Sequence, residues 1–457
     1  MRTSLLILLL ALFGPATAQT VFRESELLAV VREQHPVARV ARTEVAVARA
    51  GLLSRRGAFD PVIGGSSNQK DLVGTTYYDR WQTELKVPTW YGIDVTAGLE
   101  EARGSRLNPE VTPGALSYVG VSVPLGQRLL FDKRRAALRT AQVLVEASEA
   151  ARREALNNLL YDALTAYWHW WEAYTVLQQS DSALDLAAQR LRMVRTYVQL
   201  GDRAALDTVE AATQVQAFAF AREEALLRLQ KARLELAAYL WKDGTTPVEL
   251  PSDAVPQLLS PGTPPPLNDL QQLLPDHPGI LQYRFKLQAL RIDRRLKFQS
   301  LLPEVDLKYQ WLYKGHDIGK TFNAPLLAND YRFGLRVSVP LRLSEGRGAW
   351  QAARLKLQQA ELEAANKQVQ LLTKLRQYDA EWLQTGRLLT QQQALLNSYV
   401  ALQRGEELRF RNGDGSLFLV NAREQKTWEA RRKVAELQAK KERARISVIW
   451  AAGRLPG

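Results

Sequence analysis

The chain has 457 residues, of which 24% are charged, with a formal net charge of +13 and no cysteine. The absence of cysteine excludes disulfides, cysteine-ligated zinc sites and thiol nucleophiles. A basic balance of this kind is compatible with nucleic-acid binding, but the first residues of the chain argue against that partner.

Residues 1–18 have the pattern of a secretory signal peptide. A single charge at Arg2 is followed by an apolar run over 5–13 and by the small residues 16–18, an order typical of exported chains. The apolar run is shorter than the about 20 residues of a membrane-spanning helix. We therefore expect an exported chain that begins at Gln19 with a net charge of +12 (13 − 1), without a lipid anchor and without a nucleic-acid partner.

The exported part consists of two similar halves. Each half opens with His-Pro and a helical pattern, at His35 and at His277, and each contains the string VSVPL, at 121–125 and at 337–341. Such self-similarity indicates a duplicated structural unit. Between the halves, prolines predict a linker rather than another packed element. The predicted parts are a first repeat over 19–240, a Pro-rich inter-repeat segment over 241–267 and a second repeat over 268–452.

Alternating polarity precedes VSVPL in both halves, over about 60–124 and about 303–341. Alternating segments of about ten residues with aromatic ends are typical of membrane β-barrel strands, and a soluble sheet with one wet face is the alternative. We expect two strands from the second half and two to four from the first. One chain is then too small to close a barrel of useful size, which indicates that several chains share one barrel.

Two very long helices follow the strands, over 132–200 and 344–411. At 1.5 Å per residue each is about 100 Å long, which predicts coiled-coil packing rather than a compact core. Asp132 and Ser344 are suitable N-caps. Glycine turns at Gly201 and Gly413, where positive φ has no steric cost, lead into shorter helices over 203–240 and 415–451.

This order of elements, written twice, resembles the TolC family of outer-membrane channel proteins over essentially the whole exported chain. The strings GDRAALDTVEA and NGDGSLFLVNARE, at 201–211 and 412–424, are similar to the two helix–turn–helix tips of that family. The resemblance implies a mixed, mainly α fold: a trimeric transmembrane β-barrel continued by a long α-helical coiled-coil barrel, with two internal repeats per chain. Such a trimer would have twelve strands, or eighteen with an extra first-half hairpin, and we favour twelve in the membrane.

The same resemblance implies the function of an exit channel in the outer membrane of a Gram-negative bacterium, extending into the periplasm. Such a channel belongs to a tripartite efflux or type I secretion system. It passively conducts substrate from an inner-membrane transporter and a periplasmic adaptor to the outside, without catalysis, cofactor or metal. Its partners would be two further copies of the chain, the adaptor, the transporter and outer-membrane lipid. The alternative is a periplasmic coiled-coil adaptor or scaffold without a pore, which would lack the alternating strands.

The tips and the residues after them are the first candidate sites. Family members carry two carboxylates after the second tip glycine, but this chain has Leu419 and Ala422 there, and Asp207 and Glu210 at the same offsets after Gly201. An acidic ring at the periplasmic entrance formed by Asp207 and Glu210 is our hypothesis, and a solvated helix face is the alternative. By resemblance, the adaptor-docking tips are Leu200, Gly201, Asp202, Asn412, Gly413 and Asp414.

Aromatic residues and prolines complete the candidates. The string AYWHWWEAY over 166–174 is expected to pack the helices, since His169 has no paired histidine that would indicate a metal site. Pro124 and Pro340 are expected to end barrel strands and redirect the chain into the long helices, because proline donates no hydrogen bond. Aromatic residues expected at the membrane–water boundary, with sheet packing as the alternative, are Trp90, Tyr91, Trp311, Tyr313, Tyr331 and Phe333.

Overall fold

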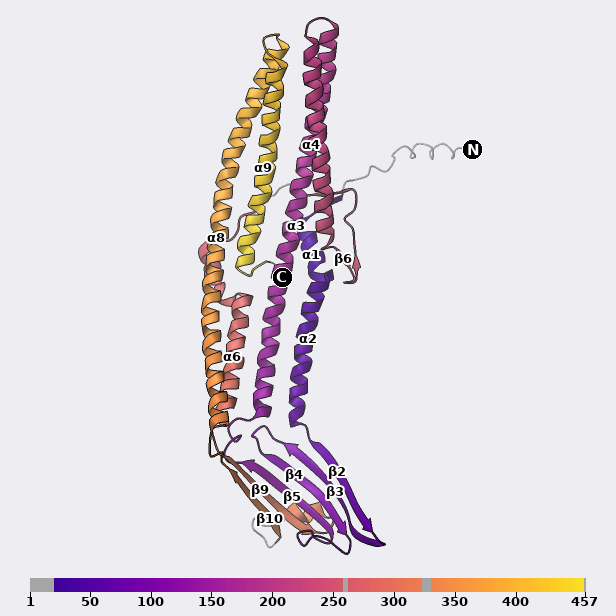
Figure 1. The fold of residues 1–457 in the computed structure, drawn as a ribbon, viewed down its shortest axis with the longest axis vertical. Coiled ribbons are helices and arrows are strands. Elements are labelled where there is room, and N and C mark those ends of the chain that lie inside the picture. The colour runs from indigo at the N-terminus through magenta and orange to yellow at the C-terminus, as the bar shows by residue number, and fades with distance from the viewer. Residues whose placement is uncertain (1–19, 258–261, 323–329, 456–457) are drawn as a thin grey trace, which may run out of the picture. The chain divides into compact units, whose positions relative to one another are not determined.

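The computed structural model describes residues 20–257, 262–322 and 330–455 (Figure 1). The predicted signal peptide over 1–18 lies outside these residues. The described chain divides into two compact units, and each unit combines segments from both sequence repeats. Unit 1 contains the described residues of Met1–Arg42, Ala151–Pro278 and Gln368–Gly457, and unit 2 contains Thr43–Ala150 and those of Gly279–Lys367.

Unit 2 holds one antiparallel sheet of six strands in the order β10-β9-β5-β4-β3-β2 (Figure 1). The pairing of β5 with β9, which places Val119 opposite Trp311, joins the two repeats. The first repeat contributes four strands, the upper end of the expected range, and β2 and β3 are hydrogen-bonded into the same sheet as the rest. The strands are β2 (Val62–Leu72), β3 (Thr75–Pro88), β4 (Asp94–Arg103), β5 (Gly114–Pro124), β9 (Glu304–Lys314) and β10 (Tyr331–Ser338).

The register separates the side chains of this sheet into two faces, because residues opposite each other in a ladder point to the same side. We call the two sides the apolar face and the polar face. The apolar face carries Leu85, Val95, Ala97, Leu99, Val119, Val121, Val123, Leu307, Tyr309, Trp311, Phe333, Leu335 and Val337. The polar face carries Gln82, Glu84, Lys86, Asp94, Glu100, Ser122, Asp306, Lys308, Gln310, Arg332 and Arg336.

A buried tyrosine organises the polar face. The Tyr118 hydroxyl donates a hydrogen bond to Glu84 at 2.7 Å and accepts one from the Gln82 amide at 2.9 Å. Its ring lies over Gly98, where an added Cβ would come within 2.5 Å of the ring. Glycine is therefore required at position 98 so that the tyrosine can cross the neighbouring strand.

Unit 2 also contains most of α2 (Pro36–Arg56), most of α6 (Pro278–Gln299) and the beginnings of α3 (Lys133–Gln199) and α8 (Ser344–Arg411). Asp132 caps α3, since its carboxylate accepts a hydrogen bond from the Arg135 amide at 2.7 Å. The expectation that Ser344 caps α8 is wrong. The Leu343 carbonyl accepts from the Arg347 amide at 2.8 Å, so Ser344 is already the first helical residue.

A short helix, α7 (Ile318–Phe322), packs on the sheet in unit 2. The Ser117 hydroxyl of β5, which is fully buried, lies 3.1 Å from the Thr321 hydroxyl of α7. On the same face, His316 stacks on Trp81 with ring centroids 6.2 Å apart. The segment after β9 therefore covers the apolar face near the strand ends farther from α3 and α8.

Unit 1 is built from α1 (Glu24–Gln34), α4 (Ala205–Ala237), α9 (Leu417–Ala451) and the remaining lengths of α3 and α8. The aromatic string over 166–174 lies on α3 and supplies much of the core. Tyr167, Trp168, Trp170 and Trp171 are buried together with Leu27, Val31 and Leu236. The Tyr167 hydroxyl donates to the Phe22 carbonyl at 2.9 Å, and burial raises the pKa of this hydroxyl to about 12.

The Pro-rich segment between the repeats is packed, against the expectation of a linker. Its strand β8 (Ala254–Pro256) pairs in parallel with β1 (Thr20–Phe22), and Leu250 and Ala254 belong to the aromatic core. Apolar residues between the prolines explain this, because proline is tolerated in short edge strands while its neighbours are buried. The other short elements are η1 (Gly57–Phe59), β6 (Trp241–Lys242), β7 (Thr246–Pro247), α5 (Leu267–Gln272) and η2 (Leu274–Asp276).

Within the described ranges, none of the helices combines the length and the apolar character needed to cross a membrane.

Candidate functional site

The two helix hairpins of unit 1, α3–α4 and α8–α9, end in turns of the same geometry (Figure 1). Gly201 has a φ of 79° and Gly413 a φ of 88°. At the first turn the Gly201 amide donates to Val198 and the Asp202 amide to Tyr197. The second turn repeats both hydrogen bonds 212 positions later. This pair is a Schellman motif, which needs the left-handed conformation that glycine adopts without steric cost.

An arginine links the two turns. The Arg203 guanidinium donates to the carbonyls of Phe410 at 2.9 Å and Gly415 at 3.3 Å, and it stacks over the Phe410 ring at 4.3 Å. The Phe410 carbonyl lies in the last turn of α8, where a cation is favoured by the helix dipole, and the Gly415 carbonyl lies in the turn between α8 and α9. This contact is not among those expected from the sequence. A signal was present, because the position equivalent to Arg203 in the second repeat is Gly415, which has no side chain to return the contact.

A buried ion cluster joins the hairpins farther along the helices. Arg190 of α3 forms an ion pair with Glu424 of α9 and another with Glu407 of α8 at 3.4 Å. The side chains of Arg190 and Glu424 are 10% and 5% exposed. Burial raises the pKa of Glu424, while the Arg190 guanidinium opposes that rise. An apolar cluster of Val194, Ala211, Phe410, Leu417 and Val420 lies between this ion cluster and the turns.

The predicted acidic residues lie on the first turn of α4 and just after it. Glu210 is half-buried and accepts a hydrogen bond from the buried Asn421 amide of α9 at 3.2 Å. Asp207 is also half-buried, three residues earlier on the same helix. The Glu210 carboxylate therefore contributes to the contact between the hairpins, and the acidic ring stays a prediction.

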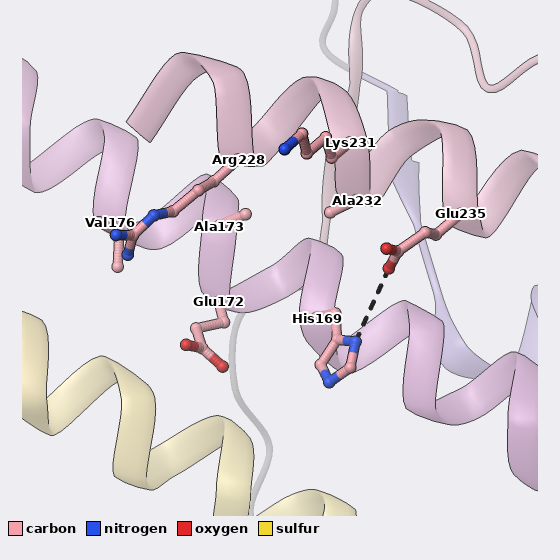
Figure 2. A pocket seen from close by; sticks show the side chains of 8 residues that line it. All are labelled: His169, Glu172, Ala173, Val176, Arg228, Lys231, Ala232 and Glu235. Atoms are coloured by element: carbon pink, nitrogen blue, oxygen red, sulfur yellow. Dashed lines mark ion pairs between the residues drawn. The ribbon is translucent and has the colours of Figure 1, made fainter. Parts of the chain in front are cut away.

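A shallow cavity of about 220 Å³ lies between α3 and α4 (Figure 2). Both carboxylates of the cavity have partners within the protein. Glu235 lies 3.8 Å from a His169 ring nitrogen, and Glu172 accepts a hydrogen bond from Arg443 at 3.1 Å. Burial, with the positive charge of Arg443, lowers the pKa of His169. The cavity contains both signs of charge without convergence on one point, and we assign it no function.

The predicted aromatic residues of the sheet form two groups. Trp90 and Tyr91 lie in the turn between β3 and β4, at the sheet end from which the chain enters α3, and both are exposed. Trp311, Tyr313, Tyr331 and Phe333 lie on the apolar face toward the opposite strand ends. The two groups are therefore separated along the strands, as two interface belts would require.

The two prolines lie at joints of different length. The β5 ladder ends at Pro124, and residues 125–132 lead to α3, whereas β10 ends two residues before Pro340 and residues 341–343 lead to α8. The longer joint is held by Arg128, whose guanidinium binds Asp306 at 2.6 Å. The first joint also requires Gly126, since a Cβ there would lie 2.2 Å from the Pro303 carbonyl.

Comparisons with known proteins agree with this architecture. No family model matches the chain. It is 24% identical over 224 residues to the outer membrane efflux protein BepC of Brucella suis biovar 1 (strain 1330), which covers 48% of this chain and 46% of that protein. The aligned part thus spans about half the length of that relative.

Several solved structures share the fold. The channel protein CusC superposes with a TM-score of 0.68 at 17% identity, covering 97% of this chain and 96% of that one. The Campylobacter jejuni CmeC outer membrane channel gives 0.66 at 15% identity, covering 94% and 85%. The outer membrane protein VceC of Vibrio cholerae gives 0.66 at 14% identity, covering 94% and 96%. The predicted resemblance to TolC-like channels is therefore confirmed for the fold.

Proposed function

We propose that the chain is a subunit of a homotrimeric exit channel in the outer membrane of a Gram-negative bacterium, extending into the periplasm. The channel would belong to a tripartite efflux or type I secretion system and conduct substrate passively, without enzymatic activity or a cofactor. The observation that carries this proposal is the six-stranded sheet with one apolar and one charged face, the pattern of a membrane barrel around a wet lumen. The fold shared with solved outer membrane channels supports the same role.

Exposed apolar residues at heptad spacing support assembly with further copies of the chain. On α4 they are Leu206, Phe220, Leu227 and Leu234, which recur at multiples of seven and are each more than half exposed. On α8 two further series recur at multiples of seven residues, with exposures between 41% and 68%. Seven-residue spacing is the seam pattern of coiled coils, and these seams have no cover within the described chain. The two series on α8 are Leu355, Leu362, Val369 and Leu383, and Leu388, Leu395 and Leu402.

The hairpin tips are the proposed docking surface for the periplasmic adaptor. Around the two Schellman turns, Leu200 is 68% exposed, and Leu206, Val209 and Phe418 are exposed to a similar degree. Large apolar side chains concentrated at a helix turn are typical of a protein contact surface. The docking residues remain those predicted from the sequence: Leu200, Gly201, Asp202, Asn412, Gly413 and Asp414.

The proposed membrane contact is tested by two matched substitutions on β5. Val121 lies on the apolar face and its neighbour Ser122 on the polar face, and both are half-buried. An arginine on the lipid side of a membrane strand costs about 2–4 kcal/mol near the bilayer midplane, whereas a lumen position tolerates charge. We expect Val121→Arg to remove the protein from the outer-membrane fraction. Ser122→Arg should leave heat-modifiable trimers in that fraction and change their single-channel conductance in planar bilayers.

The alternative function gives a different result. A periplasmic adaptor or scaffold without a pore would be recovered from the periplasm, would show no single-channel conductance, and would have no reason to distinguish Val121→Arg from Ser122→Arg beyond local packing. Recovery of the unmodified protein from the periplasm alone would overturn the proposed function. If the protein is instead recovered as a conducting outer-membrane trimer, the transporter and adaptor that copurify with it would identify the class of cargo.

A further inference from the structure

Within residues 20–257, 262–322 and 330–455, the six-stranded sheet ends in two unpaired edges, one on β2 and one on β10. Every residue of both strands is exposed. Soluble proteins protect such edges with short strands, prolines or inward-pointing charges. Here β2 has eleven residues without proline, with a bulge only near its C-terminal end, and β10 has eight residues without proline. Neither edge is therefore protected by a short strand or by proline, and both are available for pairing.

The directions of the two edge strands match. Neighbouring strands of the sheet are all antiparallel, and the number of strands is even. As a result β2 and β10 run antiparallel to each other. A β10 edge placed beside the β2 edge of a second copy continues the same antiparallel ladder, and a cyclic arrangement repeats this seam until the sheet closes. A closed sheet leaves no edge, which a bilayer requires.

The side chains also complement each other across that seam. On the apolar face, β10 carries large residues that include Phe333 and Leu335, both more than half exposed. The positions of β2 on the same face carry mostly small or uncharged residues. Glycine in a strand leaves room that an aromatic side chain on the adjacent strand fills. These positions, which we call the outward positions of β2, are Ile63, Gly65, Ser67 and Gln69.

We propose that the β2–β3 hairpin is part of the barrel wall, so that each subunit supplies six strands and the seam joins β10 of one copy to β2 of the next. This inference rests on the proposed function and replaces the expectation of twelve membrane strands with eighteen in a trimer. Barrel diameter grows roughly linearly with strand number, so the lumen is about 1.5 times as wide as with twelve strands. Barrels of sixteen to eighteen strands leave an aqueous channel, which fits bulky hydrophilic solutes.

A twelve-strand barrel would place a different strand beside β10 of the neighbouring copy. If β2 and β3 folded away from the wall, the edge next to β10 of the neighbouring copy would be β4, which runs in the same direction as β2. The two arrangements therefore bring different residues beside Leu335. Because the chain has no cysteine, pairs of introduced cysteines report directly on which strand is the neighbour.

The experiment introduces Leu335→Cys together with one cysteine at each outward position of β2 in turn. The comparison set combines Leu335→Cys with Val95→Cys, Ala97→Cys or Leu99→Cys on the same face of β4. Leu307 and Leu335 lie opposite each other within one chain. A Leu307→Cys/Leu335→Cys variant therefore controls for oxidation, because its disulfide is intramolecular and leaves the subunit a monomer in denaturing gels. Full-length proteins are oxidised in outer-membrane vesicles and separated in denaturing gels with and without reductant.

We expect at least one β2 pairing to give covalent dimers and trimers that disappear on reduction, and the β4 set to give none. Cross-linking through β4 instead would overturn the eighteen-strand wall while leaving the channel function intact. Trimers that conduct but cross-link through neither strand would also overturn it. Failure of the proposed function is a separate result, seen as absence of trimers and of conductance in the cysteine-free parent.

Discussion

Substitution of Arg190 by methionine should loosen the contact between the two helix hairpins near their tips. Arg190 supplies the positive charge for Glu424, whose side chain is only 5% exposed, and for the half-buried Glu407. Methionine keeps the volume of the arginine stem but leaves the Glu424 carboxylate buried without this partner. Arg431 also acts on Glu424 but more weakly than Arg190.

Removal of one partner from a buried ion pair costs about 3–5 kcal/mol. A difference of 1.4 kcal/mol changes an equilibrium constant by a factor of about ten. The equilibrium constant for separation of the two hairpins should therefore rise by roughly a hundredfold or more at pH 8. Folding already raises the pKa of Glu424 through burial, and the substitution removes the Arg190 charge that lowers this pKa. The folded variant therefore binds the proton more tightly than the unfolded chain. Its stability falls as pH rises above the unfolded value of about 4.3, so the cost should be small near pH 5.

Hydrogen exchange of the amides near the C-terminal end of α3 and the N-terminal end of α9, corrected for intrinsic rates, measures this local opening. The double variant Arg190→Met/Glu424→Met removes both charges and should recover most of the lost protection, since an apolar pair of similar volume is often neutral or stabilising. Lys433→Met is the matched control on α9. Its pair with Glu436 is half exposed and is expected to contribute less than about 1 kcal/mol.

The reasoning is refuted if Arg190→Met leaves tip protection within about threefold of the parent at pH 8. It is equally refuted if the loss does not diminish toward pH 5, or if the double variant is as unprotected as the single one.

Three further predictions concern the tips. Gly413→Val forces a β-branched residue to a φ of 88° at a cost of about 1–2 kcal/mol or more, and should abolish export while trimers still form. Gly405→Ala, in the interior of α8 where a Cβ meets nothing within 4 Å, should instead stabilise by about 0.5–1 kcal/mol in thermal unfolding and leave export normal. Arg203→Ala should raise the amide exchange rates at 410–415 by roughly tenfold, because two hydrogen bonds to carbonyl oxygens and the contact with the Phe410 ring are lost. Unchanged exchange rates would contradict the role of Arg203 in linking the two turns. Asp207→Asn/Glu210→Gln should weaken cation block and cation selectivity of single channels, and unchanged currents would rule out the acidic ring.

Much of this fold is encoded locally and could be predicted. The alternation in β9 and β10 follows from a period of two residues, and the long helices follow from good helix formers without interruption. Gly201 and Gly413 identify the turns because few other residues adopt positive φ. The duplication is visible as a constant offset of 212 from the long helices to the turns.

Other features depend on contacts between distant residues. The strand number of the first half was ambiguous because the alternation of β2 is interrupted by Gly64–Gly65 and polar residues, and only its ladder with β3 makes it a strand of this sheet. The Pro-rich segment was expected to be a linker because proline content outweighed Leu250 and Ala254, whose burial is decided by the aromatic core.

The amino-acid sequence by itself predicted the signal peptide and the duplication, and it determined the alternating faces of the strands, the long helices and their glycine turns. The strands, helices and turns follow from the conformational preferences of neighbouring residues. Only the tertiary structure decided that Arg190 meets Glu424, 234 positions away, and that Arg203 caps α8. It also decided that β5 pairs with β9 to leave β2 and β10 as the open edges. Partner choice among many exposed charges and strands carries no periodic signal, because it is set by which surfaces are brought together when the helices and strands pack.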